Sequence, residues 1–258
     1  MASINELYNK LEEAIPAELS CDWDNDGRMV VPNGEKDVKK ALICLDVTES
    51  AVDYAIENGF DCIISHHPII FHGIKNIDSD YYAGRKLCKL IKNDISVFSF
   101  HTRLDKVSGG VNDALADLLK LKNVTEFSDV GRMGEVISDK DLGVTQRFAT
   151  LIREALELSG YSLTIVDSGR WVKKVAIVGG SGKDYIEEAY KCGCDTLITG
   201  EVPYNYQQEA KEMGINLVLG GHYFTENVVC PRIEMLVKNF DMDIYTEIYN
   251  DTNPAIER

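Results

Sequence analysis

The fold is decided by a segment that occurs twice, "KKALICLDVTESAVDYAIENGFDCIISHH" (39–67) and "KKVAIVGGSGKDYIEEAYKCGCDTLITGE" (173–201). The two copies align without a gap at a shift of 134 residues, and seven of the 29 positions are identical. Each has the pattern of a buried strand, a helix and a second buried strand. A further helix and strand follow each copy, ending in "ISVFSFH" (95–101) and "INLVLGGH" (215–222). This alternation predicts an α/β fold of two similar units that arose by internal duplication, each with a mostly parallel sheet covered by helices.

The duplication also predicts the domain boundaries. We expect a first α/β unit over residues 1–125, completed by residues 223–258, and a second α/β unit over residues 126–222. Residues 122–140 would form the crossover between them. The last strand-like stretch, "DMDIYTEIY" (241–249), is expected to pair with the sheet of the first unit.

Composition excludes several classes of protein. The 258 residues suit two modest domains, and the net charge of −15 argues against a broad nucleic-acid or anionic-membrane surface. The seven cysteines are odd in number and scattered, which indicates a reducing compartment without a disulfide framework. The first 16 residues predict an amphipathic helix and not a signal peptide, and no apolar run reaches the ~20 residues that span a bilayer. We therefore expect a soluble, cytoplasmic protein.

The five histidines of the chain are distributed unevenly. His66 and His67 end the second strand of the first unit, and His101 ends its third. His222 ends the equivalent third strand of the second unit. Ligand sites of open α/β sheets lie outside the carboxyl ends of the strands, so these positions indicate a site.

Metal binding is the chemistry that this pattern favours. The candidate ligands are His66, His67, Asp105, His222 and Glu226. A helix beginning at His222 would present Glu226 on the same face. Imidazole and carboxylate together suit zinc, iron, manganese or nickel, and five ligands suit two divalent ions better than one. Adjacent histidines on a strand point to opposite faces, so each would bind a different ion.

Other features are weaker. His101 is a candidate catalytic residue that would relay a proton, orient a ligand or simply pack, whereas His72 is expected to face solvent. The stretch "VGGSGKD" (178–184) lacks the first glycine of a phosphate-binding loop and predicts a glycine-rich turn. The acidic stretch "CDWDNDG" (21–27) either borders the site or forms a solvated turn.

Three motifs together carry a family resemblance: "SHHP" (65–68), "HTRLD…GGVNDALA" (101–116) and "GGHYFTE" (220–226). With them the chain resembles the NGG-interacting-factor-three-like family, often called type 2 homologues of GTP cyclohydrolase I. The resemblance covers nearly the whole chain. It implies a dinuclear metal site in the cleft between the two units and a homohexamer that is a trimer of dimers. It places the family's ligands on the same five residues. Arg28, where the family has an aliphatic residue, and "TGEVPYNY" (199–206) depart from the pattern and affect the expected substrate contacts.

From these observations we expect a metal-dependent hydrolase that uses a metal-activated water, GTP cyclohydrolase-like or acting on another nucleotide or phosphoester. The alternatives are a metal-binding or metal-delivery protein without catalysis, and an interaction scaffold stapled by metal. The sequence does not identify the metal or the substrate.

Overall fold

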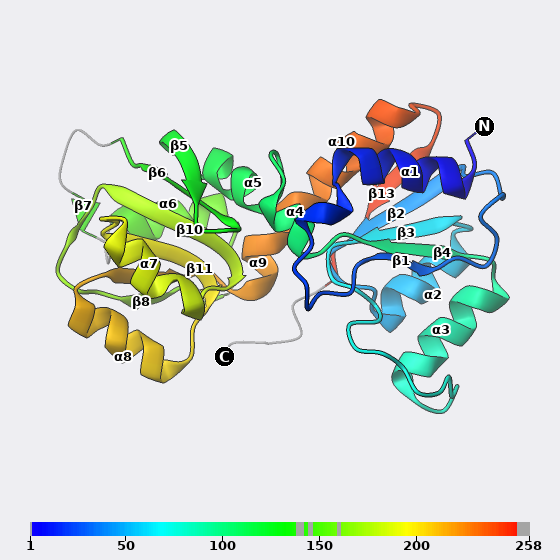
Figure 1. The fold of residues 1–258 in the computed structure, drawn as a ribbon, viewed down its shortest axis with the longest axis horizontal. Helices are drawn as coiled ribbons and strands as arrows, with labels where there is room; N and C mark the ends of the chain where they lie inside the picture. Colours follow the sequence, from blue (N-terminus) through cyan, green and yellow to red (C-terminus); the bar gives the residue numbers. More distant parts are fainter. Residues whose placement is uncertain (1, 138–141, 144–146, 159–160, 252–258) are drawn as a thin grey trace. The chain divides into compact units, whose positions relative to one another are not determined.

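The computed structural model describes residues 2–137, 142–143, 147–158 and 161–251. The described chain forms two compact units, of which unit 1 comprises residues 2–107 and 229–251 and unit 2 comprises residues 108–228 (Figure 1). In the part of the chain that is described, no helix has both the length and the apolar character needed to cross a membrane.

Unit 1 is built on a five-stranded sheet with the order β1-β4-β3-β2-β13. Its elements are β1 (Gly27–Val30), β2 (Lys40–Cys44), β3 (Cys62–Ser65), β4 (Ser96–Ser99), β13 (Tyr245–Ile248), α1 (Ile4–Ala14), α2 (Glu49–Glu57), α3 (Tyr82–Lys92), α4 (Thr102–Lys106), α10 (Cys230–Phe240) and the 3-10 turn η1 (Ala17–Leu19). Strands β4, β3, β2 and β13 are parallel, and only the edge strand β1 is antiparallel. The last strand therefore pairs with the sheet of the first unit, which confirms that prediction.

Helices cover both faces of this sheet, with α1 and α10 on one side and α2 and α3 on the other (Figure 1). Every residue of β3 and β4 is buried. Successive side chains along these strands point to opposite faces of the sheet. Leu42 and Ile63 pack in the cluster that contains Val52 and Leu87 of the helices, whereas Phe98 meets Tyr8 of α1 with ring centroids 5.0 Å apart. Burial on both faces explains why the central strands are continuously apolar.

Unit 2 is built on a six-stranded sheet with the order β5-β6-β10-β11-β12-β8, beside a two-stranded sheet of β7 and β9. Its elements are β5 (Lys122–Phe127), β6 (Gly131–Glu135), β7 (Leu142–Gly143), β8 (Thr164–Val166), β9 (Trp171–Val172), β10 (Lys174–Ser181), β11 (Thr196–Glu201), β12 (Asn216–Leu219), α5 (Val111–Leu118), α6 (Ala149–Ala155), η3 (Lys183–Tyr185), α7 (Ile186–Lys191), α8 (Tyr204–Met213) and α9 (His222–Glu226). The turn η4 (Asn227–Val229) follows α9. Strands β10, β11 and β12 are parallel, and their outer neighbours are antiparallel.

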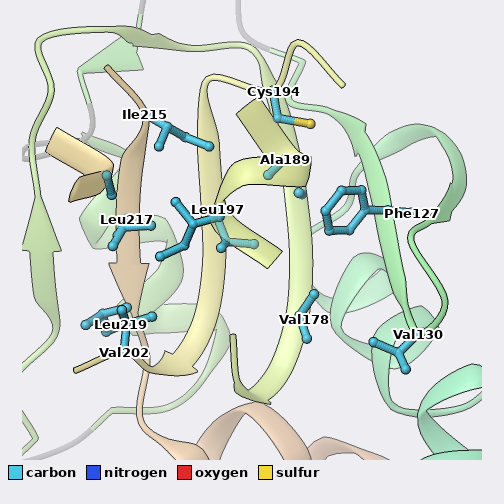
Figure 2. Packing of buried hydrophobic residues seen from close by; sticks show 13 residues of the cluster. Phe127, Val130, Val178, Ala189, Cys194, Leu197, Val202, Ile215, Leu217 and Leu219 are labelled. Atoms are coloured by element: carbon cyan, nitrogen blue, oxygen red, sulfur yellow. The ribbon is translucent and has the colours of Figure 1, made fainter. Parts of the chain in front are cut away.

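The core of unit 2 also lies on both faces of its sheet. Val178, Leu197 and Leu217 pack with residues of α7 and α8 on one face, and Figure 2 shows this cluster closed at its edge by Phe127. On the other face, Ile177 packs with residues of α5 and α6. Alternation along β10 thus divides its side chains between the two clusters.

The two units share the register that the sequence repeat predicts. Ala41 lies opposite Cys62 in unit 1, and Val175 lies opposite Thr196 in unit 2, which is the same pairing 134 residues further along. Each copy also has an aspartate that ties the start of the first strand. Asp195 accepts hydrogen bonds from the backbone N–H groups of residues 173 and 174 at 2.9 and 2.8 Å. Its counterpart, residue 61, accepts from residues 39 and 40 at 2.7 and 3.0 Å. These shared details support the predicted duplication.

The division into units falls at different residues from those predicted. The predicted units, 1–125 with 223–258 and 126–222, place α5 in the first unit, but α5 contacts β6 and β10 of unit 2. The reason is that Leu115 and Ala116 bury their side chains in the apolar cluster of unit 2. The stretch predicted as a crossover, 122–140, contains strands β5 and β6, and its last three residues lie outside the described chain.

Replacing Asp195 by alanine is expected to lower the free energy of unfolding by about 1–3 kcal/mol, because the N–H groups of Lys173 and Lys174 lose a charged acceptor. Asp61→Ala should have an effect of the same size. Chemical denaturation measures both, and Glu57→Ala, at an exposed position of α2, is the control that should change the stability by less than about 0.5 kcal/mol. Unchanged stability in both aspartate variants would contradict the role given to these bonds.

Candidate metal centre

Unit 1 brings together three of the sequence-predicted histidines. His66 and His67 directly follow β3, and His101 lies two residues after the end of β4, which is the parallel neighbour of β3. Each of the three rings offers a nitrogen within 4.8 Å of the others, and the ring centroids are 5.0–5.7 Å apart. These residues could hold a metal ion, so the carboxyl end of this sheet carries a candidate metal cluster, called here the histidine cluster.

Hydrogen bonding fixes the tautomer of the buried His66. Its Nδ1 lies 2.9 Å from the carbonyl oxygen of Phe100. A carbonyl oxygen only accepts, so Nδ1 carries the proton and donates it. The lone pair of the neutral ring is then on Nε2, which is the atom that could bind a metal ion.

His67 and His101 are oriented in the same way, each by a carboxylate. The Nδ1 of His67 donates to Asp46 at 2.8 Å, and the Nδ1 of His101 donates to Asp24 at 2.8 Å. Histidines that ligate metals usually donate their other ring N–H to a carboxylate or a carbonyl. All three rings of the histidine cluster meet that condition.

Asp105 supplies a carboxylate beside the histidine cluster. It lies on α4, the short helix that begins after His101, and its Oδ1 is 3.8 Å from Nε2 of His66. Nitrogen and oxygen ligands bind zinc at about 2.0–2.2 Å, so two atoms that share an ion are at most roughly 4.3 Å apart. The distance between His66 and Asp105 therefore fits a shared ion.

The acidic stretch "CDWDNDG" is part of this site, which settles the alternative left open by the sequence. Besides His101, Asp24 accepts hydrogen bonds from the backbone N–H and the hydroxyl of Thr102 at 3.0 and 2.6 Å. Asp26 accepts from the backbone N–H of His101 and from Nε of the buried Arg103, both at 3.1 Å. The two carboxylates thus fix the start of α4.

Unit 2 holds the other two predicted ligands. His222 and Glu226 are the first and last residues of α9, and His222 Nε2 lies 3.0 Å from Glu226 Oε2. The spacing of four residues places both side chains on one face, as the sequence predicted. Glu201, at the end of β11, accepts from the Nδ1 of His222 at 3.2 Å. Helix α9 follows β12 as α4 follows β4, so each unit carries an acidic candidate ligand on a short helix after its third parallel strand.

Glycines make room for the pair in unit 2. Gly180 has a φ of +66°, and a Cβ at this position would lie 2.1 Å from Glu226 Oε1 and 3.2 Å from His222 Nε2. A Cβ at Gly200 would lie 2.8 Å from the Cα of His222. The stretch "VGGSGKD", predicted to be a turn, is instead the end of β10 followed by η3, and its glycines let the backbone approach α9 closely.

Some site residues were missed by sequence reasoning. These residues are Asp24, Asp26, Asp46 and Glu201. The repeat contained a signal for one of them, because Glu201 occupies in the second copy the position of His67 in the first. His72, which was predicted to face solvent, is exposed and packs its ring on Phe71 with centroids 4.7 Å apart.

Asp24→Asn is expected to lower the free energy of unfolding of the metal-free protein by about 1–3 kcal/mol at neutral pH. Although burial of Asp24 raises its pKa, the hydrogen bonds from His101 and Thr102 outweigh burial and hold the pKa well below the ordinary value of 3.8. A lowered folded-state pKa means that this stabilisation is fully present above about pH 5 and decreases as the pH falls below about 4. Urea denaturation at pH 7 and pH 3 measures the change.

The matched control for that experiment is Asp22→Asn, at an exposed neighbouring position. It should show no difference from the unsubstituted protein at either pH. A stability difference between Asp24→Asn and the unsubstituted protein that grows at low pH would contradict the proposed direction.

Comparison with known proteins places the chain in a family. The model of the Duf34/NIF3 (NGG1p interacting factor 3) family matches residues 2–254. A GTP cyclohydrolase 1 type 2 homolog of Clostridium perfringens is 35% identical over 250 residues, which cover 93% of this chain and 94% of the relative. A GTP cyclohydrolase 1 type 2 homolog of Methanocaldococcus jannaschii is 31% identical over 247 residues, with coverage of 93% and 96%.

Solved structures agree with the sequence comparison. The hypothetical protein SA1388 of Staphylococcus aureus superposes with a TM-score of 0.88 at 29% identity and covers 99% of both chains. Reduced HcgD from Methanocaldococcus jannaschii gives a TM-score of 0.83 at 27% identity, with coverage of 96% of this chain and 97% of that chain. The family model and the relatives each span nearly the whole sequence, and the chain therefore belongs to the Duf34/NIF3 family.

Proposed function

We propose that the protein holds two divalent metal ions and is a metal-dependent hydrolase. The ligands would be His66, His67 and Asp105 of unit 1 with His222 and Glu226 of unit 2. The observation that carries the proposal is the orientation of the histidines in unit 1, where every Nδ1 is bonded to an oxygen acceptor, as in histidines that bind metal through Nε2. Zinc, iron, manganese and nickel all accept this mixture of ligands.

The two proposed acidic ligands lie close in sequence to the boundaries between the units. Asp105 lies three residues before residue 108, where the chain enters unit 2, and Glu226 lies three residues before residue 229, where it returns to unit 1. Three residues span at most about 11 Å. Both acidic ligands are therefore tethered near the points where the chain passes from one unit to the other.

Bound divalent ions would supply Lewis acidity and lower the pKa of water at the site. The residues of the chain would orient the reactants and move protons. We assign the proton relay to His101, because its ring lies in the histidine cluster and its Nδ1 is held by the buried carboxylate of Asp24. A carboxylate at this position keeps the imidazole in one tautomer and stabilises its protonated form.

The names of the relatives suggest the substrate class. Curated relatives are called GTP cyclohydrolase 1 type 2 homologs, so we propose a nucleotide or a related phosphoester as substrate. The family resemblance adds a homohexamer, arranged as a trimer of dimers, and a cytoplasmic location to the proposal. A screen of the metal-loaded protein against nucleotides, phosphoesters and amides tests catalysis. Turnover in none of them, together with rapid transfer of metal to an apoprotein, would favour a metal-delivery protein instead.

The metal content of purified variants tests which residues are ligands. His66→Ala and His67→Ala should each reduce the bound metal from about two ions per chain toward one, because each histidine serves a different ion. Asp105→Ala should reduce both, since its carboxylate would bridge the ions. His72→Ala is the control and should retain two. Elemental analysis of the purified variants gives the counts, and full occupancy in both His66→Ala and His67→Ala would overturn the assignment.

Gly180→Ala tests the contribution of unit 2. The new Cβ would displace the Glu226 carboxylate, so we expect metal affinity to fall by about tenfold or more. Gly193→Ala is a matched control, because Gly193 has a similar φ of +75° with nothing within 4 Å of the added Cβ. Both substitutions should cost about 1–2 kcal/mol of stability through backbone strain, but only the first should change metal affinity. Equal metal affinity in the two variants would argue against Glu226 as a ligand.

A further inference from the structure

Trp23 is an exposed tryptophan in a fixed position. Its side chain is 65% exposed, although tryptophan is highly buried on average. The turn that carries it is tied down on both sides. Cys21 donates its backbone N–H to the Thr102 hydroxyl at 2.9 Å, and Asp24 bonds the same residue. On the far side, the side-chain amide of Asn25 donates to the Ile70 carbonyl. The exposure of Trp23 is thus not the result of a loose loop.

Phe71 lies against Trp23. It follows directly on Ile70, so the bond from Asn25 joins the segments that carry the two rings. The ring centroids are 6.1 Å apart with an interplanar angle of 68°, and Phe71 is itself 40% exposed. A pair of fixed, solvent-exposed aromatic rings buries little apolar area in the folded chain, so its packing alone does not explain it.

The aromatic pair continues into the histidine cluster. The His101 ring lies 6.2 Å from Trp23 at 78° and 5.9 Å from Phe71 at 85°. The three rings are therefore nearly perpendicular to one another. These contacts cover only part of the indole, and the 65% exposure of Trp23 leaves most of its ring surface open to solvent. That open surface lies one ring away from nitrogens that could hold a metal ion.

We propose that Trp23 and Phe71 form a stacking subsite for the planar ring of a substrate that is bound at the histidine cluster. This inference rests on the proposed function and narrows its substrate class to molecules with a flat heteroaromatic ring joined to a metal-binding oxygen or nitrogen. Stacking on an aromatic side chain is tolerant of the identity of the ring, because every base has a π-face. The stacking subsite would recognise the planar ring of the substrate, and the histidine cluster would recognise its metal-binding oxygen or nitrogen.

Fluorescence isolates the proposed contact, because the chain has two tryptophans. In the Trp171→Phe variant Trp23 is the only one left. Loaded with Mn²⁺, this variant should show saturable quenching by guanosine and none by ribose, which lacks the ring. Trp23→Phe leaves only Trp171, which is exposed on unit 2, and its fluorescence should not respond. Absence of saturable quenching by guanosine, adenosine and uridine alike would overturn the subsite.

Calorimetry of guanosine binding gives the size of the effect. Trp23→Ala should weaken binding by about tenfold, in line with the loss of one base–aromatic stack. Trp171→Ala, which removes the other exposed indole of the chain, should leave the affinity unchanged. Guanosine affinity that is the same in Trp23→Ala and in the unsubstituted protein would also overturn the proposal.

Metal analysis of the same samples separates this proposal from the proposed function. Trp23→Ala should retain the metal content of the unsubstituted protein, since the indole is no ligand. If the unsubstituted protein takes up no metal but guanosine still quenches Trp23, the stacking subsite stands and the metal centre falls. If metal is bound and Trp23→Ala does not change the affinity for guanosine, the metal centre stands and the stacking subsite falls.

Discussion

Parallel pairing of β3 with β4 is the constraint on which the histidine cluster depends. The carboxyl ends of parallel neighbours meet at one edge of the sheet, so the residues that follow them, His66 and His101, become neighbours. Side chains alternate along a strand, and a slip of one residue in β3 would exchange the faces of His66 and His67. The bonds of these rings to Phe100 and Asp46 would then be lost together. The register of β3 therefore determines both the tautomers of these histidines and the positions of their ring nitrogens.

Much of the fold could be predicted because its signals are local or repeated. The continuous apolar runs of β2 and β3 recur in β10 and β11, and the pairing register recurs with them. The boundaries of the units were harder to predict. An amphipathic helix such as α5 shows in sequence that it needs a core, but the sequence does not say which of two similar cores it joins.

The residues of the candidate site likewise fall into those with a local sequence signal and those without one. His66, His67, His222 and Glu226 could be found because they lie at strand ends or at helical spacing. The residues that orient the histidines could not. Asp24 meets His101 across 77 positions of the chain, and an aspartate in a polar loop has the same local pattern whether it is solvated or buried. Only the tertiary structure distinguishes the two.

The discontinuity of unit 1 has a consequence for the order of folding. Among the residues that the structure describes, unit 2 lies between residues 108 and 228, so its sheet can form during synthesis as soon as residue 228 is available. Unit 1 has to wait for α10 and β13, because contacts such as that between Tyr54 and Glu247 join residues 193 positions apart. Until then β2 is an unpaired sheet edge and the apolar face that α10 covers is open to water. The slow step of folding, and the stage most exposed to aggregation, should therefore be the late completion of unit 1, after unit 2 has folded.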